Sequence, residues 1–291
     1  MKLQGKLLLN ESMRRYTSWR AGGAVDRLYI PAGLEDLQCF LQSLPTGEAI
    51  YFIGLGSNLL VRDGGVRGTV VLMHDALTGL RFEGASVYAE AGVTCAKLAK
   101  FAAREHLRGA EFLAGIPGTV GGALAMNAGC FGGETWGIVS RAFTIDRHGN
   151  VLERSQADVE VGYRHVVLPG EEWFVAAWFQ LHEGESGEAE EKIKALLAKR
   201  LATQPLNLPN AGSTFRNPEG DFAARLIEAS GLKGCRIGGA QVSELHANFI
   251  VNPGDATADD IERLIAHMRD TVLQKQGVEL QREVKIIGEK L

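Results

Sequence analysis

The run Phe-Ile-Gly-Leu-Gly-Ser-Asn-Leu-Leu-Val-Arg-Asp, from Phe52 to Asp63, sets the architecture that we expect for this chain. Its apolar start leads into Gly54 and Gly56, and the polar pair Ser57-Asn58 follows. Glycines leave backbone N–H groups uncovered, so this loop can turn them inward around a pyrophosphate. The third glycine of the usual dinucleotide fingerprint is missing, because Leu59 stands in its place. The loop therefore predicts a phosphate-bearing ligand but not the common dinucleotide fold.

A second glycine cluster, Gly-Ile-Pro-Gly-Thr-Val-Gly-Gly-Ala-Leu-Ala-Met-Asn-Ala-Gly, runs from Gly115 to Gly129. Two such loops in one chain favour a large cofactor that carries phosphate groups. The alternative for either loop alone is a tight turn without a ligand, since glycine clusters also mark simple turns.

Length and charge narrow the class of protein. A chain of 291 residues is long enough for two or three domains. Its 31 basic and 35 acidic residues give a net charge of −4, and no basic run interleaved with aromatics is present. We therefore expect small-molecule ligands and no nucleic-acid partner. Residues 1–15 do not resemble a signal peptide and no window reaches membrane-spanning length, so we expect a cytoplasmic protein without a membrane partner. We also expect a monomer.

The four cysteines, Cys39, Cys95, Cys130 and Cys235, lie far apart in the sequence. None belongs to a paired Cys-x-x-Cys spacing with neighbouring histidines, as a zinc site would require. The pattern predicts buried thiols and no metal site.

Hydrophobic periodicity predicts an α+β protein, with strands and helices mixed along the chain. An acidic link at 183–191 leads into a helix that ends near Arg200, and 204–210 then breaks regular structure. We therefore expect domains at 1–75, 76–204 and 205–291. The predicted strands are 27–30, 49–53, 70–73, 79–82, 87–91, 142–145, 151–154, 173–181, 248–251 and 278–287, and the predicted helices are 34–44, 95–106, 221–230 and 257–276.

Three polar residues are candidates for chemistry. Ser213 lies in Asn-Ala-Gly-Ser-Thr-Phe-Arg-Asn-Pro, where small neighbours expose its hydroxyl; a turn or helix-capping serine is the structural alternative. Arg164, in Tyr163-Arg164-His165, can bind a carboxylate with two parallel hydrogen bonds, although an arginine at the surface is the common alternative. Glu283 shares one strand face with other polar side chains, and such a face is often simply solvated.

Six motifs, taken in order, resemble the UDP-N-acetylenolpyruvoylglucosamine reductase family, also called the UDP-N-acetylmuramate dehydrogenases. The match extends over nearly the whole chain, although each motif alone is modest. The motifs are Thr17-Ser-Trp-Arg-Ala-Gly-Gly23, Gly54-Leu-Gly-Ser-Asn-Leu-Leu60, Gly115-Ile-Pro-Gly-Thr-Val-Gly-Gly122, Tyr163-Arg164, Ala211-Gly-Ser213 and Arg282-Glu-Val284.

The resemblance implies a fold of the vanillyl-alcohol-oxidase type, with FAD held by two subdomains and a C-terminal α+β domain for the substrate. The short link after Tyr163 is similar to the compact members that lack an extra tyrosine loop. The implied reaction is the reduction of UDP-N-acetylglucosamine enolpyruvate to UDP-N-acetylmuramate, a peptidoglycan precursor, with NADPH as electron donor.

The resemblance also implies residue roles. Ser213 would donate a proton, Arg164 would neutralise the substrate carboxylate, and Glu283 would stabilise an enol-like intermediate. Tyr163, Arg164, Arg216 and Asn217 would bind substrate, and Arg216 stands where a lysine is frequent in relatives. The residues that would bind FAD are Gly54, Leu55, Gly56, Ser57, Asn58, Leu59, Gly115, Pro117, Gly118, Thr119, Gly121, Gly122, Asn127 and Arg200.

Two other functions remain open at this point. One is a flavin oxidase or dehydrogenase that acts on another alcohol through the same cofactor domains. The other is a nucleotide-binding protein without catalysis, such as a sensor or a cofactor carrier. The combination of Ser213, Arg164 and Glu283 argues against the first, and it would be unexplained in the second.

Overall fold

The computed structural model describes residues 3–291, and their contacts divide the chain into two units. Unit 1 comprises the residues up to Leu8, Leu28–Leu55 and Thr69–Arg200. Unit 2 comprises Leu9–Arg27, Gly56–Gly68 and Leu201–Leu291. The three predicted domains, with boundaries at 75/76 and 204/205, stay a prediction.

A five-stranded sheet with the order β12-β11-β15-β7-β6 is the centre of unit 1. All of its pairings are antiparallel, as the alternating sequence predicts. Asp146 forms the turn between β11 and β12, since its Oδ1 accepts from the backbone N–H groups of His148 and Asn150. The strands are β6 (Leu80–Glu83), β7 (Ser86–Glu90), β11 (Val139–Asp146), β12 (Val151–Arg154) and β15 (Glu172–Gln180).

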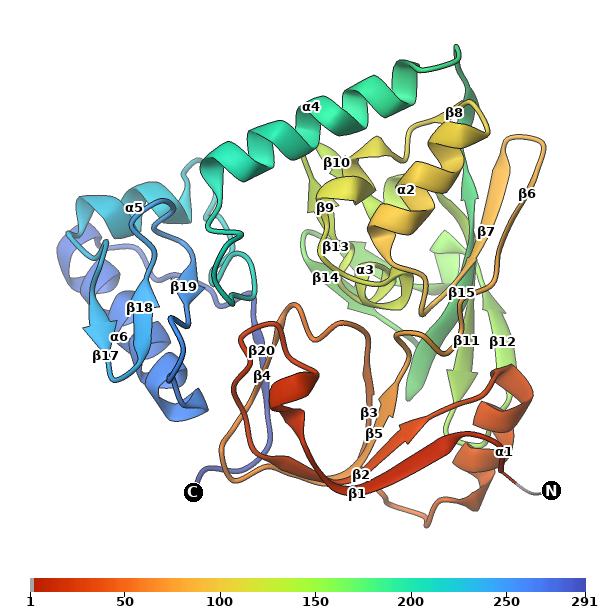
Figure 1. Cartoon of the computed structure of the whole chain (residues 1–291), viewed down its shortest axis with the longest axis horizontal. Coiled ribbons are helices and arrows are strands. Elements are labelled where there is room, and N and C mark those ends of the chain that lie inside the picture. Colours follow the sequence, from red (N-terminus) through yellow and green to blue (C-terminus); the bar gives the residue numbers. More distant parts are fainter. Residues whose placement is uncertain (1–2) are drawn as a thin grey trace. The chain divides into compact units, whose positions relative to one another are not determined.

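Two helices, α2 (Cys95–Arg104) and α3 (Val120–Met126), cover one face of this sheet (Figure 1). Leu98 of α2 and Leu124 of α3 are fully buried in one core cluster with Phe179 of β15. The sequence did not predict α3, because its glycines disfavour a helix. A Cβ at Gly121 would lie 2.9 Å from the Cβ of Ala91, so close packing rather than propensity keeps glycine in this helix.

A second sheet has the strand order β1-β2-β5-β3, and helix α1 (Leu34–Ser43) packs with its strands. Its strands are β1 (Lys6–Ser12), β2 (Ala24–Ile30), β3 (Ile50–Ile53) and β5 (Val66–Leu72). Within unit 1, β3 pairs with β5 in parallel, from Ile50 opposite Thr69 to Ile53 opposite Leu72. The predicted strand at 49–53 therefore ends at the first glycine loop.

Smaller elements complete unit 1. They are the strands β8 (Leu107–Arg108), β9 (Gly129–Cys130), β10 (Gly133–Glu134), β13 (Glu160–Gly162), β14 (His165–Val167) and β16 (His182–Glu183), the 3₁₀ turns η2 (Glu111–Gly115), η3 (Thr135–Gly137) and η4 (Gln156–Asp158), and the long helix α4 (Glu188–Thr203), which continues into unit 2.

Unit 2 is built around helix α6 (Ala258–Gln276), which packs with α5 (Ala223–Ala229) and the sheet β17-β18-β19. Thr257 and Asp260 form a capping box at the start of α6, and Gly277 ends it in the left-handed conformation. The remaining elements are η1 (Met13–Arg15), β4 (Leu59–Val61), β17 (Arg236–Ile237), β18 (Ala240–Val242), β19 (Ile250–Val251) and β20 (Lys285–Ile287).

The prediction that the cysteine thiols are buried is correct only for Cys95. Burial in the core raises the pKa of the Cys95 thiol to about 12. Cys39, Cys130 and Cys235 are only partly buried, and Cys235 packs against the edge of the unit 2 core. All four cysteines are free.

Candidate active site

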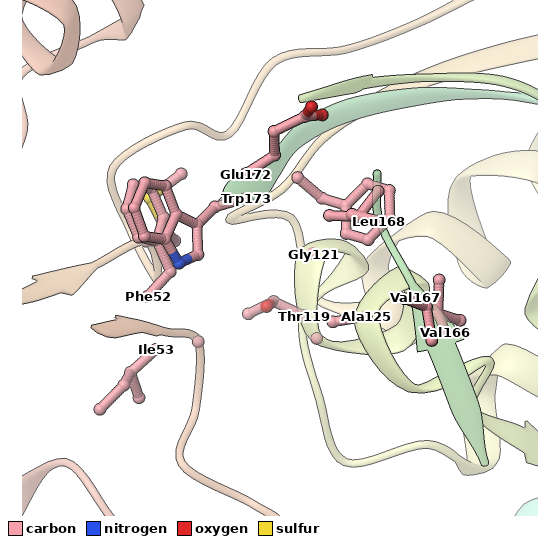
Figure 2. Close-up of a pocket in the computed structure, with 14 residues that line it drawn as sticks. Phe52, Ile53, Thr119, Gly121, Ala125, Val166, Val167, Leu168, Glu172 and Trp173 are labelled. Atoms are coloured by element: carbon pink, nitrogen blue, oxygen red, sulfur yellow. The ribbon is translucent and has the colours of Figure 1, made fainter. Parts of the chain in front are cut away.

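A pocket of about 380 Å³ opens in unit 1 where segments distant in sequence meet. Figure 2 shows Phe52 and Ile53 of β3 on one side, Thr119 and the start of α3 on another, and β14 and the start of β15 around the rest. Of the residues predicted to bind the cofactor, Gly54, Thr119, Gly121 and Gly122 line this pocket.

Thr119 carries an unusual hydroxyl group. Its side chain is 1% exposed, and its Oγ1 has no hydrogen-bond partner among residues 3–291. Thr119 precedes α3, but its side chain does not cap the helix. A buried hydroxyl without a partner costs free energy, so its presence in a pocket wall indicates that a ligand supplies the missing bond.

Gly54 allows Thr119 to occupy this position. A Cβ at Gly54 would lie 2.2 Å from Thr119 Oγ1, closer than any real contact. The glycine at this place is therefore needed to keep the hydroxyl at the pocket wall. The sequence predicted both residues as cofactor ligands but gave no sign that one makes room for the other.

One end of the pocket is aromatic and charged, and the sequence did not predict it. Phe52 and Trp173 stack with ring centroids 4.7 Å apart and planes 10° from parallel. Glu172 also lines the pocket and accepts from Arg154 at 2.5 and 3.0 Å and from Thr144 Oγ1 at 2.6 Å. The bonds from Arg154 outweigh the effect of burial and lower the pKa of Glu172.

Other predicted cofactor ligands in unit 1 are not among the residues that line this pocket. They are Leu55, Gly115, Pro117, Gly118, Asn127 and Arg200. A Cβ at Gly115 would lie 2.8 Å from Cys130 Sγ, so this glycine serves close packing. The carbonyl of Gly118 accepts from the N–H of Cys95 and so joins this loop to the start of α2. Burial lowers the pKa of the Arg200 guanidinium near the end of α4.

Arg164 sits at the tip of the hairpin formed by β13 and β14, whose two-residue turn is Tyr163-Arg164. Its φ of 55° is in the left-handed region, which costs a non-glycine residue about 1 kcal/mol. Its guanidinium donates to the carbonyls of Asn127 at 3.3 Å and Gly129 at 2.6 Å. Tyr163 is 47% exposed, and its ring centroid lies 5.1 Å from Cζ of Arg164.

The same hairpin also forms a wall of the pocket through Val166 and Val167 (Figure 2). Arg164, the predicted carboxylate-binding residue, therefore bonds to the end of the second glycine cluster, and its hairpin lines the same pocket as Thr119. The spacing of these segments in the sequence gave no sign of this.

Asn127 is hydrogen-bonded to this hairpin. It is 2% exposed, and its Nδ2 donates to Glu134 Oε2 at 3.0 Å and to the Gly162 carbonyl at 3.1 Å. Its Oδ1 accepts from the N–H of Trp136. Because both amide N–H groups and one acceptor position of Oδ1 are used inside unit 1, only the second acceptor position of the amide oxygen is left for the predicted cofactor contact.

Unit 2 brings two further predicted segments together. Phe215 and Arg282 form an antiparallel bridge, and the N–H of Glu283 donates to the Thr214 carbonyl at 2.9 Å. Ser213, which is half-buried, directly precedes Thr214. Two candidates for proton chemistry that are seventy residues apart in sequence, Ser213 and Glu283, are thus attached to one stretch of paired backbone.

The loop Gly56–Leu59 joins this stretch. Asn58 Nδ2 donates to the Glu283 carbonyl at 3.2 Å, and the N–H of Lys285 donates to the Asn58 carbonyl at 3.0 Å. Gly56 has a φ of +60°, and a Cβ there would lie 2.0 Å from the Tyr16 carbonyl oxygen. Of the first glycine loop, Gly54 and Leu55 therefore belong to unit 1, and Gly56, Ser57, Asn58 and Leu59 belong to unit 2.

The predicted substrate ligands Arg216 and Asn217 follow Ser213 in the same segment. The N–H of Arg216 donates to the Gln281 carbonyl, which continues the pairing with the segment that carries Glu283. Asn217 is exposed, and its Oδ1 accepts from the N–H of Ala223 at the start of α5. The backbone of Arg216 and the side chain of Asn217 are therefore each hydrogen-bonded to a neighbouring segment of unit 2.

No group of three or more His, Cys, Asp or Glu side chains that could hold a metal ion occurs in the described part of the chain. Within residues 3–291, no helix combines the length and the apolar character needed to cross a membrane.

Comparisons with known proteins agree with this geometry. The model of the FAD binding domain matches residues 25–154, and the model of the UDP-N-acetylenolpyruvoylglucosamine reductase C-terminal domain matches residues 204–287. Together they confirm the predicted fold class, an FAD-binding fold of the predicted type followed by a C-terminal α+β domain.

Relatives match over nearly the whole chain. The UDP-N-acetylenolpyruvoylglucosamine reductase of Thiobacillus denitrificans is 58% identical over 304 residues, which cover 99% of this chain and 94% of that protein. The enzyme of the same name from Alkalilimnicola ehrlichii is 59% identical over 285 residues, which cover 98% and 96%. The crystal structure of the Thermus caldophilus reductase matches with a TM-score of 0.82 and 31% identity, over 99% of this chain and 100% of that one. The chain is therefore an FAD-dependent oxidoreductase and belongs to the UDP-N-acetylenolpyruvoylglucosamine reductase family.

Proposed function

We propose that this protein reduces UDP-N-acetylglucosamine enolpyruvate to UDP-N-acetylmuramate with NADPH as electron donor, as a step of peptidoglycan synthesis. The observation that carries the proposal is the pairing of the Ser213 segment with the Glu283 segment in a member of this family. This pairing attaches a hydroxyl and a carboxyl group to one fixed backbone frame, as proton delivery to a single carbon atom requires.

The residues of unit 1 fit FAD. The unpartnered hydroxyl of Thr119 offers a hydrogen bond to a cofactor oxygen or nitrogen atom. Gly54, Gly121 and Gly122 let a flat or phosphate-bearing group approach the backbone closely, and the stacked pair of Phe52 and Trp173 adds an aromatic wall. When bound, FAD supplies the relay of a hydride equivalent from NADPH to the enolpyruvyl carbon.

Arg164 binds the substrate carboxylate in this proposal. Hydride addition to the terminal carbon of the enolpyruvyl group moves negative charge toward the carboxylate, and a guanidinium stabilises that charge through hydrogen bonds. Glu283 stabilises the enol-like form of the same group. Tyr163, Arg216 and Asn217 hold other parts of the sugar nucleotide.

Ser213 donates its hydroxyl proton to the carbon next to the carboxylate, which forms the new C–H bond of the lactyl ether. A serine hydroxyl is a weak acid, so it serves this role only toward a strongly basic enolate and only when it is held in place. The serine oxygen then regains a proton from solvent.

An anaerobic titration tests the function. The purified protein should show flavin absorbance that NADPH bleaches and that UDP-N-acetylglucosamine enolpyruvate then restores. An oxidase of another alcohol would regain its colour with oxygen but not with the sugar nucleotide. A carrier would not turn over with either. Failure of the sugar nucleotide to restore the colour would refute the proposed substrate, and a protein that stays colourless with added FAD would refute the cofactor site.

A further inference from the structure

We propose that Asn248 is a positioning residue that holds the hydroxyl of Ser213 in place for proton donation; this inference rests on the proposed function. The side chain of Asn248 bonds to Phe215, and the sequence predicted nothing of Asn248 beyond its place at the start of the strand 248–251.

The segment that carries Ser213 has little regular structure of its own. Before the serine, Asn210 Oδ1 accepts from the N–H of Gly212, which turns with a φ of +72°. An irregular segment of this kind keeps one conformation only when its neighbours fix its backbone groups. The bonds on the other side of Ser213 complete the support of the backbone that carries its hydroxyl.

Asn248 supplies those bonds. The Asn248 carbonyl accepts from the N–H of Thr214 at 2.8 Å. Its side chain then contacts one further residue twice, since Oδ1 accepts from the N–H of Phe215 at 3.0 Å and Nδ2 donates to the Phe215 carbonyl at 2.8 Å. The side-chain amide therefore binds both backbone groups of Phe215, as a residue of a neighbouring strand would. Asn248 is 2% exposed, so water does not compete for these bonds.

The opposite edge of the same two residues binds the Glu283 segment. The Thr214 carbonyl accepts from the N–H of Glu283, and Phe215 is bridged to Arg282. Thr214 and Phe215 therefore lie between Asn248 on one side and the Glu283 segment on the other. A change at Asn248 would shift Ser213 relative to Glu283, because both are attached to these two residues.

Asn252 offers a matched control. It is also 2% exposed, and its amide is also bound to backbone, with Nδ2 on the Trp19 carbonyl at 2.8 Å and Oδ1 on the N–H groups of Gly254 and Ala256 at 2.9 and 3.0 Å. Its side chain supports a different part of unit 2. The two asparagines are equally buried and both bind backbone groups, but they hold different segments.

The test compares Asn248→Asp with Asn252→Asp in the FAD-loaded protein. An aspartate keeps the shape but places an oxygen opposite the carbonyl that the amide N–H had bound. Both variants should lose similar thermal stability. Only Asn248→Asp should slow flavin reoxidation by the enolpyruvyl sugar nucleotide, about a hundredfold, because a small misplacement of a reacting group has an effect of this size. Flavin reduction by NADPH should stay within about twofold of the wild-type rate in both.

A double-mutant cycle separates positioning from a general structural effect. In the Ser213→Ala background, Asn248→Asp should add little further loss of reoxidation rate, since the group that it positions is gone. Full additivity, equal loss in both half-reactions, or equal reoxidation rates in the two asparagine variants would each overturn the proposal. If Asn248→Asp fails to fold, Asn248→Ser removes both side-chain bonds to Phe215 without placing an oxygen against its carbonyl, and it should give the same pattern. A wild-type protein that the sugar nucleotide cannot reoxidise would instead refute the proposed function.

Discussion

The Arg164 hairpin of unit 1 and the Ser213 segment of unit 2 differ in whether the candidate side chain takes part in holding its own backbone in place. Each is supported by a buried asparagine, Asn127 in one case and Asn248 in the other. In the hairpin, however, the Arg164 guanidinium itself donates to two backbone carbonyls and so is part of its own support. Around Ser213, the support runs through the backbone of the residues beside it.

This difference determines whether a substitution changes the reaction rate alone or the rate and the stability together. A side chain whose backbone is held by other residues can be substituted without changing the hydrogen bonds that hold that backbone. A side chain that forms part of the frame cannot be changed without affecting both. Substitutions in the two regions should therefore differ in what they do to stability as well as to rate.

Ser213→Ala should have the largest effect on rate. Loss of the proton donor should slow flavin reoxidation by the sugar nucleotide by about 10²–10⁴-fold, the usual contribution of a positioned acid. Flavin reduction and the melting temperature should stay near the wild-type values, because the frame is intact. Stopped-flow absorbance and thermal unfolding measure these quantities. A drop in melting temperature of several degrees would show that the serine is part of its own support.

Arg164→Lys should combine a smaller rate effect with a loss of local order. Lysine keeps the charge but cannot reach two carbonyls with a planar fork, so reoxidation should fall about tenfold to a hundredfold and the hairpin amides should exchange faster. Hydrogen exchange of residues 160–167 follows the second effect. Arg164→Gly is the control for strain, since it removes the left-handed penalty of about 1 kcal/mol together with the guanidinium. Unchanged exchange in Arg164→Lys would remove the contrast between the two regions.

Acid should affect the pocket wall of unit 1 through Glu172. Its folded-state pKa lies below the ordinary value of 4.5, because of the bonds from Arg154. The stability that this pair contributes is present above pH 4.5 and is lost as the pH falls through the folded-state pKa. Trp173 follows Glu172 in the sequence, so its fluorescence should change as the pH is lowered below 4.5.

Glu172→Gln is the comparison for that titration. It should lower the free energy of unfolding at pH 7 by about 1–3 kcal/mol, because Arg154 loses a charged partner, and it should abolish this part of the pH dependence. An acid profile of the variant that matches the wild type would assign the titration to another group.

Thr214→Val should have the smallest effect and the opposite sign. The Thr214 hydroxyl is fully buried and has no hydrogen-bond partner in the described chain, so a methyl group of similar shape should raise the free energy of unfolding by about 1 kcal/mol. Because Asn248 binds only the backbone of Thr214, the reoxidation rate should remain near that of the wild type. Chemical denaturation measures the first quantity and stopped-flow absorbance the second. A large loss of rate would show that this hydroxyl supports Ser213 directly.

The sequence predicted the regular elements well where periodicity was strong. Helix 257–276 and strands 151–154 and 79–82 lie within a residue of their observed positions. Strand β1 was missed because it is an edge strand with little buried apolar surface, since Leu7 and Leu9 are 48% and 65% exposed. Helix α3 was missed because the packing that permits its glycines is tertiary.

The candidate site was predictable in part, because its motifs are local. Gly54, Thr119 and the glycines of α3 line the pocket that the glycine loops predicted. Glu172 and Trp173 were missed, since they join the pocket only through the pairing of β15 with β11. Asn248 was missed for the same kind of reason, because its partner Phe215 lies 33 positions away in sequence.

The pairing of β4 with β20 has a consequence for how the protein is made. β4 ends at Val61, and its parallel partner β20 begins only at Lys285. At ribosomal rates of about 5–20 residues per second, β4 waits on the order of ten seconds or longer for this partner to be synthesised. The segment that carries Asn58 therefore gains its final shape among the last events of synthesis, and a nascent chain stalled before Lys285 would expose an unpaired strand edge to chaperones or to other chains.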